Sequence, residues 1–127
     1  MESTNTDRAG MLGLMASDIR AKAEWVYGSV SFLTIAKALF TDGTFAMIVY
    51  RLMQASHRCH LVPLAMLFNK LNAIGGRCII GRGASFGRGF VLIHSLGVVI
   101  GASVRGGEDI RIEPQVTIGA EKRLAPT

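Results

Sequence analysis

One histidine of the chain, His94, stands where an imidazole could act as a general base. It lies in the segment LIHSLG, among apolar and small residues. An imidazole titrates near pH 6.5, so it can take the proton of a hydroxyl group as that hydroxyl attacks a substrate, and such a base contributes roughly 10²–10⁴-fold to a rate. The residues alone leave two interpretations open, a catalytic histidine and a histidine at a surface turn, and they favour the second.

The other reactive side chains form weaker patterns. Residues 83–87 match the G-x-S-x-G pattern of a hydrolase nucleophile, but that motif needs a following helix and an acid between the serine and the histidine. No acidic residue lies between Ser85 and His94. His57 and His60 share a helix face, but two ligands are too few for a structural zinc. We therefore expect neither a serine hydrolase nor a metal site.

A six-residue repeat surrounds His94. Seven large apolar residues follow one another at a fixed spacing of six: Ile80, Phe86, Leu92, Val98, Val104, Ile110 and Val116. A second row, mostly small or apolar, runs four residues behind the first, from Ala84 to Ala120, and Glu108 is its one clear exception. Neither the helical period of 3.6 nor the strand period of 2 explains this spacing. A short fixed repeat is typical of a solenoid, in which each coil stacks on its neighbours.

The repeat also predicts how the coils stack. If three six-residue units make one triangular coil, residues eighteen apart in the sequence should stack, for example Ile80, Val98 and Val116. His94 lies outside both apolar rows, so its side chain should face a cleft. A solenoid of little more than two coils exposes an open edge at each end. We expect the preceding segment to cover one edge, and later coils or partner subunits to cover the other.

The segment before the repeat predicts helices. Ser17 is a suitable N-cap, Pro63 suits the first turn of a later helix, and a pair of glycines at 75–76 is a typical helix stop. The sequence therefore predicts three parts: a flexible tail over 1–16, a helical domain over 17–76, and the start of the solenoid over 77–127.

The composition limits the class of protein. The 127 residues are 50% apolar, and 14 Lys and Arg stand against 9 Asp and Glu, which suits an anionic ligand but equally a nucleic acid or a membrane surface. The arginine–glycine pairs sit inside an apolar periodic frame, so we expect no nucleic acid partner. We expect a cytoplasmic protein without membrane association for three reasons. The two cysteines lack the spacing of a disulfide scaffold, the sequence shows no signal peptide, and it has no uncharged apolar run of about 18 residues.

The repeat resembles that of the hexapeptide-repeat acyltransferases, which fold as left-handed parallel β-helices. The segment GRGFVLIHSLGVVIG, followed by VTIG at 116–119, resembles specifically the serine O-acetyltransferases and their close relatives that act on sugars. The helical half is similar to that family's helical domain in SDIRA at 17–21 and FAMIVYRL at 45–52. The resemblance implies an α+β fold, an N-terminal α-helical domain followed by a left-handed parallel β-helix that is incomplete at the C-terminus.

The resemblance also implies an activity. Members of this family move an acetyl group from acetyl-CoA to a hydroxyl, the serine enzymes in cysteine biosynthesis, and they form homotrimers or dimers of trimers with substrates bound between neighbouring β-helices. His94 matches the catalytic histidine of the family. Most family contacts to coenzyme A fall after position 127, so Gly119 and Ala120 are the expected cofactor-binding residues in this chain. No metal is implied.

The chain departs from the family at three acidic positions. The acidic partner of the histidine would fall at Ile79, a second acid at Ile93 and a third at Val26, and all three residues are apolar here. A free amino acid brings an ammonium group that these acids would neutralise. Acetylation of a sugar in exopolysaccharide biosynthesis is therefore one alternative, and a non-catalytic trimeric assembly module is another.

Overall fold

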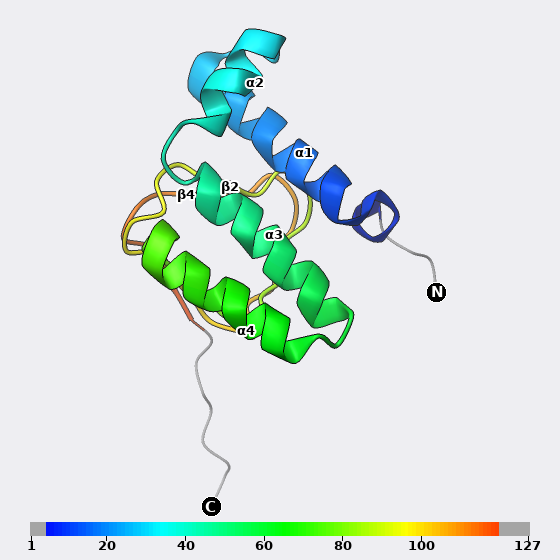
Figure 1. The fold of residues 1–127 in the computed structure, drawn as a ribbon. Helices are drawn as coiled ribbons and strands as arrows, with labels where there is room; N and C mark the ends of the chain where they lie inside the picture. Colours follow the sequence, from blue (N-terminus) through cyan, green and yellow to red (C-terminus); the bar gives the residue numbers. More distant parts are fainter. Residues whose placement is uncertain (1–4, 120–127) are drawn as a thin grey trace, which may run out of the picture.

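A computed structural model describes residues 5–119 and shows helices packed against coils of short parallel strands (Figure 1). The helices are α1 (Asn5–Tyr27), α2 (Phe32–Leu39), α3 (Thr44–Arg58) and α4 (Val62–Leu71), and α4 continues into a π-helical turn, η1 (Asn72–Gly76). The strands are β1 (Ile79–Ile80), β2 (Val91–Leu92), β3 (Val99–Ile100), β4 (Arg111–Ile112) and β5 (Thr117–Ile118). The change from helices to coils falls at residues 76–79.

Helix α1 begins earlier than predicted. It occupies residues 5–16, which the sequence assigns to a flexible tail, with a break at Gly10. Leu14 is buried on this segment. Ser17 does not cap a helix, because it lies within α1 and its hydroxyl donates to the carbonyl of Leu14. Burial of Leu14 therefore stabilises helix before residue 17, the expected start.

The other helix boundaries follow the local signals. Ser31 caps α2 through a reciprocal capping box with Thr34. Gly43 precedes α3 in a left-handed conformation, with a φ of 89°. Pro63 lies in the first turn of α4, and the π-helical turn ends at Gly76. In the part of the chain that the structure describes, no single helix is long and apolar enough to cross a membrane. Only α2 and α3 taken together meet the requirements of length and composition, and they are bent by 83°.

The strands stack in parallel from one coil to the next. Strands β1, β3 and β5 form one sheet, β2 and β4 form a second, and a single bridge between Ser85 and Arg105 marks the third side. Each strand is only two residues long, so each coil turns sharply between strands. Three sides with parallel pairing agree with the predicted triangular coil.

The predicted stacking interval of eighteen is wrong for the first coil. Ile80 pairs with Ile100, twenty residues on, whereas Ile100 pairs with Ile118, eighteen residues on. The same interval of twenty joins Leu92 to Ile112. The two additional residues lie between β2 and β3, in the turn that carries His94. Beyond this turn the first row takes the place that the second row holds in the first coil, so that Val104 follows Ala84, and Ile100 and Ile112 take the place of Ile80 and Leu92. Glu108, the exception in the second row, is exposed to solvent.

The helices hold the first coil through a buried polar cluster. The Nε and Nη2 atoms of Arg51 lie 2.7 and 2.9 Å from the carboxylate oxygens of Asp18, and the guanidinium also donates to the carbonyls of Phe86 and Gly87 at 2.9 and 2.7 Å. Asp18 in turn accepts a hydrogen bond from the backbone N–H of Phe90 at 2.9 Å. Burial raises the pKa of the Asp18 carboxyl, and Arg51 and this N–H act in the opposite direction. The cluster fixes the backbone of the coil against α1 and α3.

Three aromatic side chains fill the interior of the first coil beside this cluster. The rings of Phe86 and Phe90 stack with centroids 4.3 Å apart, and Tyr50 of α3 packs at an angle against both. The Tyr50 hydroxyl donates to the carbonyl of Ala84 at 3.0 Å and accepts from the N–H of Phe86. Burial raises the pKa of Tyr50 to about 12. The helical half therefore supplies both apolar and polar partners to the first coil.

Candidate functional site

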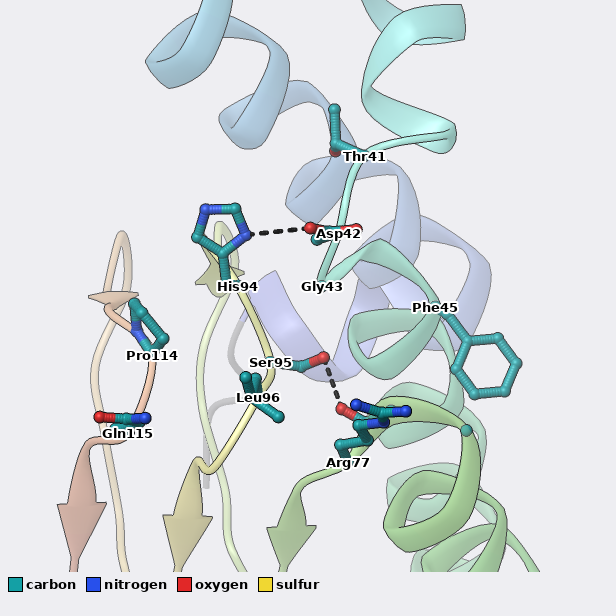
Figure 2. A pocket seen from close by; sticks show the side chains of 12 residues that line it. Thr41, Asp42, Gly43, Phe45, Arg77, His94, Ser95, Leu96, Pro114 and Gln115 are labelled. Atoms are coloured by element: carbon teal, nitrogen blue, oxygen red, sulfur yellow. Dashed lines mark hydrogen bonds and ion pairs between the residues drawn. The ribbon is translucent and has the colours of Figure 1, made fainter.

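A cleft of about 710 Å³ opens where the α2–α3 turn, the π-helical turn and the turns of two successive coils meet (Figure 2). Its walls are formed by Thr41, Asp42, Gly43, Phe45, Gly75, Gly76, Arg77, His94, Ser95, Leu96, Pro114 and Gln115. Four separate segments thus contribute to one cavity, and His94 belongs to it.

His94 lies on the turn between β2 and β3, the turn that is two residues longer than the repeat predicts. Its side chain is 53% exposed, and its Nδ1 atom lies 3.4 Å from a carboxylate oxygen of Asp42 (Figure 2). Next to it, the Ser95 hydroxyl donates to the carbonyl of Gly76 at 2.6 Å and ties this turn to the π-helical turn. The imidazole is therefore accessible from the cleft while the backbone beneath it is fixed.

The turn that carries Asp42 approaches the histidine turn closely. At Gly43, a Cβ atom would lie 2.5 Å from the carbonyl oxygen of Leu92, and the φ of 89° favours glycine as well. The hydroxyls of Thr41 and Thr44 both donate to the carbonyl of Ala38, at 2.7 and 2.6 Å. This turn holds Asp42 at the mouth of the cleft, and it has no room for a side chain at position 43.

A buried lysine supports this turn from behind. Lys22 of α1 is 1% exposed, and its ammonium donates to the carbonyl of Asp42 and, at 3.1 Å, to the hydroxyl of Thr44. Burial lowers the pKa of Lys22 to about 8, and the negative charge of Asp42 acts in the opposite direction. Helix α1 therefore takes part in positioning a residue of the cleft.

The positions at which the family has acids carry apolar side chains that do not line the cleft. Ile79 is 51% exposed on β1, Ile93 is half-buried, and Val26 is exposed near the end of α1. The carboxylate beside His94 comes instead from Asp42, in the turn between α2 and α3. No spacing in the sequence relates Asp42 to His94, because the two turns meet only in the folded chain.

The remaining predicted site residues lie elsewhere. Gly119 follows β5, is exposed, and is not part of the cleft wall, and Ala120 lies outside the described residues. His57 and His60 are exposed at the end of α3 and in the loop after it. Within residues 5–119 no three His, Cys, Asp or Glu side chains come together as a metal site.

The chain is similar to serine acetyltransferases in sequence and in fold. No family model matches it. Over 81 residues it is 35% identical to the serine acetyltransferases of two strains of Helicobacter pylori, and the match covers 64% of this chain and 47% of theirs. The soybean serine acetyltransferase complexed with serine has a TM-score of 0.77 at 25% identity, over 92% of this chain and 47% of that one. The Neisseria gonorrhoeae serine acetyltransferase has a TM-score of 0.75 at 21% identity, over 91% and 44%. The chain spans about half the length of the curated relatives that it matches.

Proposed function

We propose that this chain, which is serine acetyltransferase-like in sequence and fold, is an O-acetyltransferase that moves an acetyl group from acetyl-CoA to a hydroxyl. The observation that carries the proposal is His94, an accessible imidazole in a cleft of about 710 Å³, in a chain similar to serine acetyltransferases. A serine acetyltransferase structure in complex with CoA, with a TM-score of 0.71 and 22% identity over 84% of this chain and 44% of that one, supports the same fold.

The chemistry assigned to His94 is general base catalysis. Its Nε2 takes the proton of the acceptor hydroxyl as the oxygen forms a bond to the thioester carbonyl carbon. The tetrahedral intermediate then breaks its carbon–sulfur bond, and the coenzyme A thiolate leaves with the proton returned from the imidazolium. A hydroxyl is a poor nucleophile at neutral pH, so the positioned imidazole supplies what the reaction lacks.

Serine is the acceptor that we place first, which would assign the chain to cysteine biosynthesis. The names of the Helicobacter pylori relatives and the serine in the soybean complex support it. The cleft wall also carries the guanidinium of Arg77, a cation that suits the carboxylate of an amino acid. A sugar hydroxyl is the second candidate. Ile79, Ile93 and Val26 stand where the resemblance implies acidic residues, and an uncharged acceptor does not need those charges.

We propose in addition that the coils form a left-handed β-helix that assembles as a homotrimer. The outward residues of β1 and β3 support an interface between subunits. Ile79 and Val99 are register partners, and their side chains are 51% and 39% exposed. They form an apolar strip along the coils, which contact with another subunit would cover. Gly119 and Ala120 remain the proposed contacts to coenzyme A, and the cytoplasm remains the proposed compartment.

The test is release of free thiol from acetyl-CoA by the purified protein, first with serine and then with sugar acceptors. We expect His94→Ala to lower the rate at least about 100-fold, the lower part of the range for a general base. The matched control is His57→Ala, which removes an exposed histidine outside the cleft and should leave the rate unchanged. Equal rates for His94→Ala and the parent protein would contradict the assignment of the base.

Calorimetry with coenzyme A separates the enzyme from the assembly module. An O-acetyltransferase should release or absorb heat on binding coenzyme A. A folded trimer that binds no coenzyme A at millimolar concentration, and releases no thiol, would instead be the non-catalytic module.

A further inference from the structure

We infer that Asp42 is the positioning residue of His94, and that this chain takes the carboxylate partner of its histidine from the α2–α3 turn rather than from the repeat. The inference rests on the proposed function of His94. Among the residues that line the cleft, Asp42 is the only acid, and its carboxylate oxygen lies 3.4 Å from Nδ1 of His94 (Figure 2). The distance is that of a close ion pair, and Nδ1 is the atom through which a carboxylate orients an imidazole.

The turn is built so that Asp42 stays in place. Lys22 holds the main-chain carbonyl of Asp42 and leaves the carboxylate free to face the cleft. Gly43 lets the turn lie against the carbonyl of Leu92, two residues before His94. The two turns therefore meet through backbone packing, and the pair of side chains follows from it.

The expected consequence for the imidazole is a preferred tautomer. A carboxylate at Nδ1 accepts a hydrogen bond from Nδ1–H, which leaves the lone pair on Nε2 to take the proton of the acceptor. The same carboxylate stabilises the imidazolium that forms in this step. The Lys22 ammonium behind the turn interacts electrostatically with Asp42, and the Arg77 guanidinium belongs to the same cleft wall. Because Asp42 and His94 are 83% and 53% exposed, we expect an effect of about 10-fold on kcat, well below that of a buried triad.

The first measurement needs no activity. Long-range ¹H–¹⁵N correlation spectra of the full chain at a pH where His94 is neutral report which ring nitrogen carries the proton. The wild-type protein should show mainly the Nδ1–H tautomer, and Asp42→Asn should shift His94 toward Nε2–H. Asparagine before glycine suits a turn, so the fold should be retained. The control is Asp109→Asn, which removes a charge from the separate cleft formed with Ser17 and Arg88.

The second measurement separates positioning from substrate binding. Asp42→Asn should lower kcat about 10-fold with the KM for the acceptor unchanged, and in the His94→Ala background it should have no further effect. Identical tautomer populations in the wild-type protein and in Asp42→Asn would overturn the inference. So would a raised KM with an unchanged kcat, because Asp42 would then bind the acceptor. Full activity of His94→Ala would overturn the proposed function instead, whatever the tautomer of His94 is.

Discussion

The first coil, residues 77–96, and the second, residues 97–116, are built from the same six-residue unit but have different surroundings. Inward residues of the first coil, such as Ile80, Phe86 and Leu92, are fully buried. In the second coil Val98, Ile100 and Ile112 are buried as well, but Val104 and Ile110 are half-buried. The first coil accepts hydrogen bonds from helix side chains at the carbonyls of Ile80, Ala84, Phe86 and Gly87. In the second coil, the guanidinium of Arg111 lies over the ring of Trp25 in α1.

This difference indicates that contacts with the helices fix the first coil more than its stacking on the second coil does. The cleft lies where the rigid coil meets the freer one, at the turn with two additional residues. His94 therefore stands on backbone that is held on one side by α3 and the π-helical turn. The predictions below test how much of this rigidity comes from the helices.

The largest effect is expected at the buried guanidinium that joins α3 to the first coil. Arg51→Met removes the partner of a buried carboxylate and leaves two coil carbonyls without a donor, so we expect a loss of about 3–5 kcal/mol in the free energy of unfolding. Urea denaturation measures it. The matched control is Arg105→Met, since Arg105 also donates to a coil carbonyl, that of Gly83 at 2.7 Å, but is exposed and should contribute less than about 1 kcal/mol. Equal losses for the two variants would mean that the helices do not fix the first coil.

Much of the architecture can be predicted from the sequence because its signals are local. The apolar row at a spacing of six indicates a solenoid, and Ser31, Pro63 and the glycines at 75–76 mark helix boundaries that the structure shows. The interval between coils cannot be predicted in the same way. The two apolar rows stand four residues apart in a unit of six, so a shift of two residues moves one apolar row onto the place of the other. Hydrophobic pattern alone does not distinguish the two registers.

The candidate site also combines a residue with a local sequence signal and a residue without one. A segment similar to known enzymes identifies His94, because the similarity lies in consecutive residues. The pairing with Asp42 depends on where a helix turn meets a coil turn, and so does the cluster of Asp18 and Arg51. Both charged pairs join residues more than thirty positions apart, 33 in the buried pair. Such pairs follow from the packing of α1 and α3 on the first coil, which no spacing in the sequence encodes.

A glycine in the second coil tests the register between the two coils. With an interval of twenty, Gly106 lies against the ring of Phe86, and a Cβ atom there would clash with the ring. Gly106→Ala should therefore cost about 2 kcal/mol of unfolding free energy through overpacking. Gly107→Ala is the matched control, because a Cβ atom at Gly107 meets nothing within 4 Å. With an interval of eighteen, Val104 would instead face Phe86, and the two variants would be equally stable.

The smallest effect is expected where a helix touches the second coil. The guanidinium of Arg111 lies 4.1 Å from the ring centroid of Trp25, and both side chains are exposed, so their coupling should be about 0.5–1 kcal/mol. A double-mutant cycle of Trp25→Leu and Arg111→Met, followed by urea denaturation, isolates this coupling from the effect of each side chain alone. A coupling as large as the loss in Arg51→Met would show that α1 holds the second coil as firmly as α3 holds the first. A coupling near the expected value would leave the second coil dependent mainly on its stacking against the first.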